Sequence, residues 1–369
     1  MTYIYQQPDW PHFTWDAKGL ARRLVAAHDQ QGHLLGQMEA LGFHLRAEAT
    51  LHSLTEEIIK SNEIEGRLLD REQVRSSIAR RLGIAAVALA RPDRDVEGVV
   101  DMMLNATQQY MKPLSAGRLF DWHAALFPTG RSGMHKITVG GWRTDKTGPM
   151  QVVSGPIGHQ RVRYEAPPAT ALASEMRAFL AWFNKYDGTD LILRAGIAHL
   201  WFVTIHPFDD GNGRIARAIA DMALARSEKT PQRFYSLSAQ IQEERSAYYN
   251  ILEETQKGDL DITLWLDWFL GCLGRALAGA ETILSSVLAK ARFWERHAGM
   301  PFNERQKVVI NRLLDGFDGK LTSSKWAKLA KCSQDTAGRD IDDLLTRGIL
   351  TKNAAGGRST SYSLFVGAA

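Results

Sequence analysis

Residues 206–217 read His206-Pro-Phe-Asp-Asp-Gly-Asn-Gly-Arg-Ile-Ala-Arg217, and this stretch stands apart from the rest of the chain. An apolar helical pattern ends near His206 and Pro207, and a new helix is predicted to begin around Arg214. Between them, Gly211-Asn212-Gly213 allows backbone N–H groups to converge at the start of that helix, where the helix dipole favours anions. The stretch therefore predicts two helices joined by a loop that binds an anion.

Charged side chains in the same stretch indicate what this site would hold. Arg214 and Arg217 are i, i+3 neighbours on the first turn of the predicted helix, so both can face one anion. Two arginines beside a glycine-rich helix start indicate a ligand with more than one phosphate. Asp210 can bind Mg²⁺, which usually takes one or two carboxylates together with substrate phosphates. His206 is the nearby side chain suited to accept a proton near neutral pH.

Other nucleotide and metal sites fit the stretch less well. Gly211-x-Gly213-x-x-Ala216 formally matches the dinucleotide fingerprint, but that fingerprint needs a preceding strand and an acid about 20 residues later. The preceding residues have a helical pattern, and residues 231–236 contain no Asp or Glu. The sequence has no Walker A loop, and His199 and His206 lack a third ligand at zinc spacing. The phosphate site is therefore the interpretation we retain.

The twelve residues resemble the signature of the Fic family, His-Pro-Phe-x-[Asp/Glu]-Gly-Asn-Gly-Arg-x-x-Arg, at every fixed position. That family's proteins transfer AMP from ATP-Mg²⁺ to a hydroxyl side chain of a target protein. By this resemblance, His206 would deprotonate the hydroxyl, Asp210 would position Mg²⁺ and Arg217 would bind the γ-phosphate. The α- and β-phosphates would be bound by Gly211, Asn212, Gly213 and Arg214. The resemblance implies an adenylyltransferase that uses ATP as substrate and acts on Ser, Thr or Tyr of a target or of itself.

The resemblance extends over roughly residues 50–275. Two short β-prone runs around a Gly-Pro-Ile-Gly turn predict a hairpin at 149–165. The family places a flap there, which would align the target's backbone by β-augmentation, with Val152 or Val153 near the substrate. Downstream, the same resemblance puts three residues against the adenine, namely Tyr249, Leu252 and Gln256. The alternative is that these three side chains simply pack in the core.

Residues 61–66 read Ser61-Asn-Glu-Ile-Glu65-Gly66 and resemble the family's inhibitory pattern, [Ser/Thr]-x-x-x-Glu-[Gly/Asn]. The pattern lies N-terminal to the signature, as in the N-terminally inhibited class. By this resemblance, Glu65 would pair with Arg217 and deny the γ-phosphate its arginine. The alternative is that Glu65 and the neighbouring Glu63 are ordinary solvated acids on a helix surface.

Helical periodicity predicts a mainly α fold, a Fic-type helical core with one inserted β-hairpin flap. Asp70 is expected to start a helix with a capping-box pattern. The other predicted helices of the core cover residues 45–62, 96–110, 116–126, 169–186, 191–204, 214–225, 239–256, 263–271 and 274–291.

The pattern restarts after a break at Gly299-Met-Pro301. Helices are predicted at 303–314, 322–330 and 333–346, followed by a glycine-rich turn at 354–357 and a strand at 361–365. Three helices and a two-stranded wing are typical of a winged helix-turn-helix domain. The predicted domains are an N-terminal helical region at 1–95 with an inhibitory helix at about 45–66, a catalytic core at 96–298 and a winged helix domain at 299–369.

Composition places the chain among soluble proteins. Its 369 residues are 44% hydrophobic and 23% charged, which supports a sizeable core. Cys272 and Cys332 are too few for a disulfide framework, which favours a reducing compartment. The N-terminus lacks the features of a signal peptide, and the apolar run at 264–273 is too short to span a bilayer. We expect a cytoplasmic protein with no membrane contact.

The excess positive charge lies in the predicted winged helix domain. The net charge is +4, and residues 303–369 alone hold 11 Lys or Arg against 7 Asp or Glu. Arg339 and Arg358 could contact DNA, but the predicted recognition helix also carries four acids that phosphate would repel, Asp335, Asp340, Asp342 and Asp343. A protein-interaction or dimer-positioning role is slightly favoured over DNA binding, and a homodimer is expected.

Two functions from different classes remain open. The first is an autoinhibited protein adenylyltransferase, which the complete set of catalytic residue types favours. The second is a DNA-binding regulator whose Fic module senses nucleotides. Within the enzyme class, removal of AMP or transfer of another nucleotidyl group is also compatible with these residues.

Overall fold

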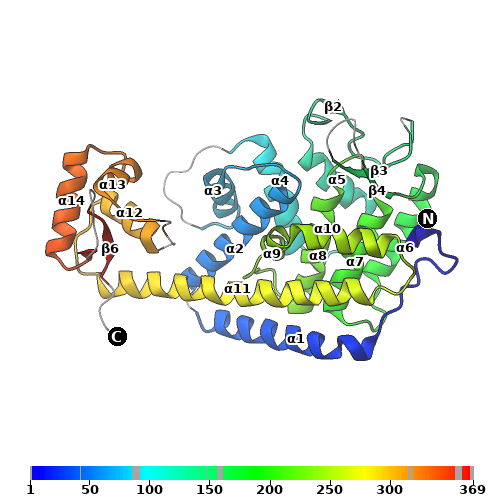
Figure 1. The fold of residues 1–369 in the computed structure, drawn as a ribbon, viewed down its shortest axis with the longest axis horizontal. Helices are drawn as coiled ribbons and strands as arrows, with labels where there is room; N and C mark the ends of the chain where they lie inside the picture. The colour runs from blue at the N-terminus through cyan, green and yellow to red at the C-terminus, as the bar shows by residue number, and fades with distance from the viewer. Residues whose placement is uncertain are drawn as a thin grey trace. The chain divides into compact units, whose positions relative to one another are not determined.

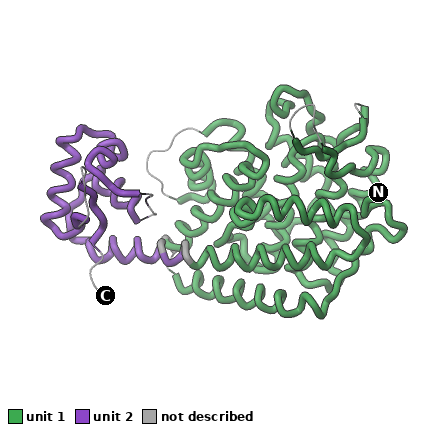
Figure 2. Tube along the Cα trace, viewed as in Figure 1, with its two compact units in different colours: residues 1–281 green, residues 282–369 purple. Residues whose placement is uncertain are grey.

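The computed structural model describes residues 2–41, 43–84, 92–146, 148–155, 161–314, 317, 319–353 and 360–365. The chain divides into two compact units, residues 1–281 and residues 282–369, which Figure 2 colours separately. Among the described residues, no helix combines the length and apolar character that a membrane crossing requires.

The first unit is almost entirely helical (Figure 1). Its helices are α1 (Ala17–Glu39), α2 (Phe43–Ile64), α3 (Arg71–Arg81), α4 (Arg94–Gln108), α5 (Ala116–Leu126), α6 (Leu172–Asn184), α7 (Leu191–Ile205), α8 (Asn212–Glu228), α9 (Leu237–Glu243), α10 (Arg245–Gln256) and the start of α11 (Thr263–Arg296). Two 3₁₀ turns, Ile4–Gln6 and Ala169–Ala171, precede α1 and α6. The N-terminal segment packs on α7, where the rings of Trp10 and Phe13 meet Trp201 edge-on.

Helices α7 and α8 form the centre of this unit. Every residue of α7 from Ile192 to Ile205 is buried, as expected for a helix that is apolar on all sides. Helix α8 is rich in alanine and is buried from Arg214 to Ala225. Small side chains allow two helices to approach closely, and α7 and α8 pack more extensively than any other pair of elements. The predicted phosphate loop therefore lies between the two most constrained helices.

The predicted helices are confirmed with two corrections. The stretch predicted as one helix at 239–256 is two helices, α9 and α10, because the backbone at Glu244 leaves helical geometry. The two helices predicted around Gly271 and Gly274 are one continuous helix, α11, in which neither glycine interrupts the turns. The predicted cap at Asp70 is present, since its carboxylate accepts from the Gln73 N–H at 2.8 Å. The rest of the capping box is absent, because the Gln73 amide accepts from the Asp93 N–H.

A small β-structure lies beside the predicted site. Strands β3 (Gln151–Ser154) and β4 (Arg161–Glu165) pair antiparallel, with a register shift between Val152 and Val153. The predicted hairpin strands are confirmed, and the tip of the hairpin at 156–160 lies outside the described residues. A second, shorter pair, β1 (Arg131–Ser132) and β2 (His135–Lys136), was not expected from the sequence.

The second unit begins with the end of α11, and its described part then contains three helices and a two-stranded ribbon. They are the helices α12 (Glu304–Leu314), α13 (Ser323–Leu329) and α14 (Gln334–Thr346), and the strands β5 (Leu350–Lys352) and β6 (Tyr362–Leu364). The unit has its own core around the fully buried Trp326, Ile310 and Leu344. The predicted glycine-rich turn at 354–357 and Arg358 lie outside the described residues. The helices and strands follow the predicted order, and the winged helix interpretation stays a prediction.

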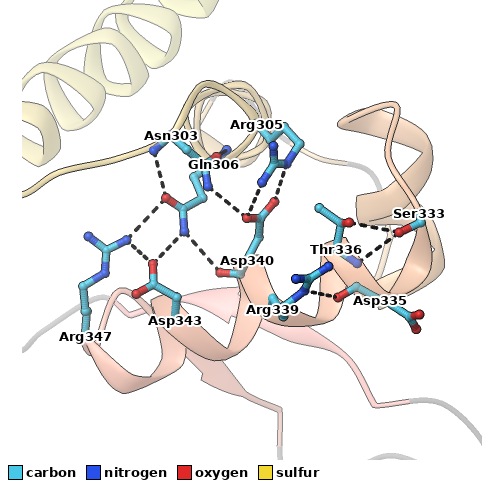
Figure 3. Close-up of polar contacts among 10 residues, drawn as sticks. All are labelled: Asn303, Arg305, Gln306, Ser333, Asp335, Thr336, Arg339, Asp340, Asp343 and Arg347. Carbon is cyan, nitrogen blue, oxygen red and sulfur yellow. Dashed lines mark hydrogen bonds and ion pairs between the residues drawn. The ribbon is translucent and has the colours of Figure 1, made fainter.

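Two of the four acids on α14 hold the unit together (Figure 3). Asp340 accepts from Arg305 Nε at 2.8 Å, Arg305 Nη2 at 2.9 Å and Asn303 Nδ2 at 2.9 Å. Asp343 accepts from Gln306 Nε2 at 2.7 Å and is paired with Arg347. These contacts neutralise both acids and tie α14 to the start of α12. The role of the unit in contacting DNA, a protein or a second copy stays a prediction.

Close packing between α4 and α5 yields a stability prediction. A Cβ on Gly98 would lie 1.8 Å from the backbone oxygen of Ala125, so Gly98→Ala must push α4 away from α5. We expect the free energy of unfolding to fall by about 3 kcal/mol, the upper end for overpacking, in urea unfolding. The control is Gly32→Ala in α1, where a Cβ meets nothing within 4 Å. It should stabilise the protein by about 0.5–1 kcal/mol; equal effects would contradict the packing argument.

Candidate functional site

His206 ends α7 with its side chain in a defined protonation state. Its backbone is left-handed, with φ at 51°, and its Nδ1 lies 3.1 Å from the carbonyl oxygen of Val203. Because a carbonyl oxygen can only accept, Nδ1 carries the proton of this hydrogen bond. Burial lowers the pKa of His206 to about 4, and the positive charge of Arg143 acts in the same direction. The imidazole is therefore neutral at pH 7 and leaves Nε2 with a free lone pair.

The loop after His206 is held from both sides. The buried amide of Asn212 bonds the backbone of Phe208 twice, accepting from its N–H at 3.0 Å and donating to its carbonyl oxygen at 2.7 Å. The buried Arg143 donates from Nε to the carbonyl oxygen of His206 at 2.7 Å, and its backbone N–H donates to Pro207 at 2.9 Å. These bonds satisfy the backbone of the loop and fix its position relative to α8.

Glycines are required where the loop enters α8. Gly211 has φ at 84°, and a Cβ there would lie 2.9 Å from the ring of Phe127. A Cβ on Gly213 would lie 2.2 Å from Oε1 of Glu65. The carboxylate of Glu65 therefore lies directly against the start of α8, where helix N–H groups attract negative charge.

Two buried arginines on α8 carry unsatisfied donors. Nε and Nη2 of Arg214 and Nη1 of Arg217 have no hydrogen-bond partner within the described part of the chain. Burial lowers the pKa of Arg214 to about 10, and its guanidinium lies over the ring of Phe127 at 5.0 Å. Its nearest carboxylate, Asp210, is 3.9 Å away. Because unsatisfied buried donors are costly, this arrangement favours the binding of an anion with several acceptor oxygens.

Arg217 is held by the end of α2. Its Nε donates to Ser61 Oγ and its Nη2 to the Ser61 carbonyl oxygen, each at 2.8 Å. Nη2 also pairs with Oε1 of Glu65 at 2.8 Å. The structure thus brings together the three residues that the resemblance linked, Ser61, Glu65 and Arg217. This geometry contradicts the alternative in which Glu65 is an ordinary solvated acid.

Asp210 lies at the edge of the same site with both carboxylate oxygens engaged. Oδ1 accepts from the Gly211 N–H at 2.6 Å, and Oδ2 accepts from the hydroxyl of Ser132. Nη2 of Arg67 is 3.5 Å from Oδ2. The described residues contain no group of three or more His, Cys, Asp or Glu side chains that could hold a metal by themselves. A cation at Asp210 would therefore need ligands from outside this set of side chains.

A cavity of about 690 Å³ covers this loop, a volume in the range of small-molecule sites. His206, Asp210, Asn212 and both glycines line its floor, and Glu65 also faces it. The other predicted contacts line its walls, namely Val152, Val153, Tyr249, Leu252 and Gln256. Tyr249 is 37% exposed, whereas Leu252 and Gln256 are buried. The structure thus gathers most of the predicted residues around one cavity, without testing their individual roles. Arg214, Arg217 and Ser61 are buried and do not line the cavity.

Sequence reasoning missed several residues of the site. Arg143, Ser132 and Arg67 contact the loop, although all three lie at least 60 residues before it. Arg163 on β4 reaches Glu253 on α10 at 2.7 Å and so ties the hairpin to the opposite wall. Arg67 carried a signal in the sequence, because it directly follows the glycine of the inhibitory pattern. The others had none, since their partners are set only by folding.

Two family models match the chain. Residues 3–84 match a model described as a domain of unknown function, DUF4172. Residues 113–224 match the model described as the Fic/DOC family. The second range includes α5 to most of α8 and the whole phosphate loop.

Similar sequences and structures agree with this match. The chain is 26% identical over 243 residues to "Protein adenylyltransferase Fic" of Drosophila grimshawi, covering 65% of this chain and 45% of that protein. It is 34% identical over 97 residues to the protein of the same name from Drosophila virilis, covering 26% of this chain and 19% of that protein. The chain thus spans less than half the length of these relatives.

Solved structures share the fold. A Fic family protein from Desulfovibrio desulfuricans G20 has a TM-score of 0.51 at 21% identity, covering 94% of this chain and 97% of that one. A Fic domain-containing signalling protein from Bacteroides thetaiotaomicron VPI-5482 has a TM-score of 0.51 at 19% identity, covering 71% and 97%. At these identities the likeness concerns the fold alone.

The buried imidazole yields a pH prediction. The folded pKa of His206 is about 4 and the unfolded value is 6.5, so unfolding takes up a proton between these pH values. The free energy of unfolding therefore falls as the pH drops from 6.5 to 4. Asparagine tolerates the left-handed backbone of this position. At pH 5, we therefore expect unfolding of His206→Asn to take up about one proton less than unfolding of the wild type.

Urea unfolding at pH 7, 6, 5 and 4.5 measures this effect from the slope of the unfolding free energy. The control is His33→Asn, because His33 is exposed on α1. It should keep the pH dependence of the wild type, and an unchanged slope in His206→Asn would show that this imidazole is not held neutral by folding.

Proposed function

We propose that the protein is an adenylyltransferase that transfers AMP from ATP to a Ser, Thr or Tyr hydroxyl of a target protein or of itself. One observation carries the proposal: a neutral imidazole with a free lone pair faces a cavity, and the helix that begins at this cavity carries two buried arginines with unsatisfied donors. A base and a phosphate site are the two parts that nucleotidyl transfer to a hydroxyl needs. The names of the sequence relatives support the same class of reaction.

The start of α8 would bind the triphosphate. The N–H groups from Gly211 to Gly213 and the free nitrogens of Arg214 would contact the α- and β-phosphates. Arg217 would bind the γ-phosphate once Glu65 has left it. Because these donors are fixed in place by buried contacts, they stabilise charge without reorganising during the reaction.

His206 would act as the general base. Its Nε2 takes the proton of the target hydroxyl as the hydroxyl oxygen attacks the α-phosphorus. A P–O bond forms to the target, the bond between the α-phosphorus and the bridging oxygen breaks, and pyrophosphate leaves. The left-handed backbone and the Nδ1 bond to Val203 hold the imidazole in the tautomer that this step needs.

Asp210 fits a Mg²⁺ ion that arrives with the nucleotide. It is a cavity-lining carboxylate next to the phosphate loop, and Mg²⁺ in such sites binds one or two carboxylates together with phosphate oxygens. When bound, the ion would offset the negative charge of the phosphates. The residues of the chain would meanwhile orient the triphosphate and exclude water.

The walls of the cavity would select the two substrates. Tyr249, Leu252 and Gln256 would contact the adenine, and the target backbone would add to the outer edge of β3 near Val152 and Val153. That edge is suited to augmentation, because β3 pairs only with β4 among the described strands. Removal of AMP, transfer of another nucleotidyl group and a nucleotide-sensing regulator remain alternatives that the same residues could serve.

Glu65 would hold the enzyme inactive. Its carboxylate makes two contacts that the γ-phosphate would otherwise make. It pairs with Arg217, and it lies against Gly213 at the start of α8. ATP could then bind only with its γ-phosphate displaced from Arg217, which misaligns the α-phosphorus for attack. This inhibition comes from within the chain and needs no second protein.

Glu65→Gly should raise AMP transfer. The change frees one buried arginine for a charged ligand, which is worth roughly 1.5–3 kcal/mol, or about 10- to 100-fold in rate. The measurement incubates purified protein with Mg²⁺ and ATP labelled at the α-phosphate, and reads covalent label on protein. The control is Glu63→Gly, because Glu63 pairs with Lys60 instead and tests the helix effect of a new glycine. Equal label on wild type and Glu65→Gly would refute inhibition by Glu65.

His206→Ala in the Glu65→Gly background should abolish transfer while ATP binding persists. Loss of a general base lowers rates about 10²–10⁴-fold, and His206 is not among the phosphate donors. His206→Asn is the companion variant, since it keeps the left-handed turn. Label from the α-phosphate on Glu65→Gly that disappears in both variants would support AMP transfer. Label from the γ-phosphate would indicate a kinase instead, and retained α-label in His206→Asn would exclude this base.

A further inference from the structure

We propose that Arg67 is a second inhibitory side chain, which withholds Asp210 from the divalent cation while Glu65 withholds Arg217 from the phosphate. The proposal rests on the proposed function, in which Glu65 alone inhibits, and adds Arg67 as a second charged group that inhibits. The end of α2 would then place a pair of opposite charges in the site, one in the position of a phosphate and one in the position of a metal ion.

A tight turn places these two charges. Helix α2 ends at Ile64, and Gly66 in the turn that follows has a φ of +74°, which is readily adopted only by residues such as glycine. The Gly66 N–H donates to the Glu63 carbonyl oxygen at 2.9 Å, and the Arg67 N–H donates to the Asn62 carbonyl oxygen at 3.0 Å. This turn lets Glu65 reach Arg217 on α8 while Arg67, two residues later, reaches Asp210 in the loop.

Three contacts hold the guanidinium of Arg67 beside Asp210. Its Nη2 lies 3.5 Å from Asp210 Oδ2 and donates to Ser132 Oγ at 3.3 Å. The same Ser132 hydroxyl donates to Oδ2, so the serine bridges the arginine and the carboxylate. The guanidinium also lies 5.4 Å from the centre of the Phe127 ring, which Arg214 approaches to 5.0 Å. Arg67 is therefore held beside Asp210, with 34% of its side chain still exposed.

This arrangement is incompatible with a cation on Asp210. Mg²⁺ needs a carboxylate oxygen at about 2.0–2.1 Å and a near-octahedral set of oxygens around it. Oδ1 of Asp210 is taken by the Gly211 N–H, and Oδ2 by Ser132 and Arg67. A divalent ion on Oδ2 would lie within a few ångströms of the arginine's positive charge, where repulsion is strong. The ion and Arg67 therefore compete for one carboxylate oxygen.

Both inhibitory charges belong to one turn, so they leave together. A displacement of the α2 end that frees Arg217 also frees Asp210, and binding of a metal–nucleotide complex opposes both contacts at once. The cation then discriminates between the inhibited and open conformations, which couples metal binding to release of inhibition.

The test measures how strongly a divalent cation strengthens nucleotide binding in the full chain. The nucleotide is α,β-methylene ATP, which is not turned over at the α-phosphorus, and its Kd is measured calorimetrically in EDTA and in Mg²⁺. We define the Kd ratio as the Kd in EDTA divided by the Kd in Mg²⁺. In Arg67→Ala we expect this ratio to rise about fivefold or more over the wild type, because the positive charge that repels the cation is gone. Arg67→Gln, which keeps a donor for Ser132, should behave the same way.

Two further variants serve as controls. Arg67→Lys keeps the charge and should retain the wild-type ratio. Arg71→Ala removes an arginine four residues later that pairs with Glu56 away from the loop, and it should also leave the ratio unchanged. Thermal unfolding of every variant identifies any that fails to fold.

The outcomes separate this proposal from the proposed function. An unchanged or smaller Kd ratio in both Arg67→Ala and Arg67→Gln overturns the role of Arg67, even if Glu65→Gly is labelled as expected. A raised ratio supports it through binding alone, even if no protein is labelled. In the labelling assay, Glu65→Gly with Arg67→Ala should reach half-maximal transfer at several-fold lower Mg²⁺ than Glu65→Gly.

Discussion

The buried guanidinium of Arg217 is the constraint on which the rest of the site depends. A positive charge with a side chain only 1% exposed must have a negative partner, because an unpaired buried charge is strongly destabilising. In this structure the partner is Glu65, which directly follows α2, and Arg217 also donates two hydrogen bonds to Ser61 in α2. Under the proposed function, a γ-phosphate would be the alternative partner, so Glu65 and a nucleotide would compete for this arginine.

The loop between α7 and α8 is held rigidly by its surroundings. Asn212 and Arg143 satisfy the loop backbone, and Gly211 fits against Phe127 with no space for a side chain. Helices α7 and α8 are buried along nearly their full length, so neither end of the loop can relax. The loop is therefore held in one conformation, and under the proposed function the change on nucleotide binding would lie at the end of α2. The second unit has its own hydrophobic core. Its Asp340 and Asp343 accept hydrogen bonds from Arg305 and Gln306 within the same unit.

Much of the fold follows from local chemistry. The predicted helices, the hairpin strands and the cap at Asp70 depend on patterns within about 15 residues, and these were confirmed. The errors arose where tertiary contacts outweigh local signals. Gly271 and Gly274 lie inside the uninterrupted α11, whose neighbouring residues Trp265, Leu266 and Phe269 are fully buried. Helical geometry is interrupted at Glu244, between α9 and α10. The carboxylate of this residue pairs with Arg275, which lies 31 residues later in the chain.

The sequence by itself determined the chemical content of the site: a histidine, a carboxylate, two arginines and a glycine-rich helix start within twelve residues. It could do so because loop and helix geometry place residues at such short spacing on one face. Only the tertiary structure decided the charge states and the occupants. Burial holds His206 neutral, leaves Arg214 with free donors and brings Glu65 and Arg67 from another helix into contact with Arg217 and Asp210. Burial and long-range pairing are properties of the packed chain, and no local spacing encodes them.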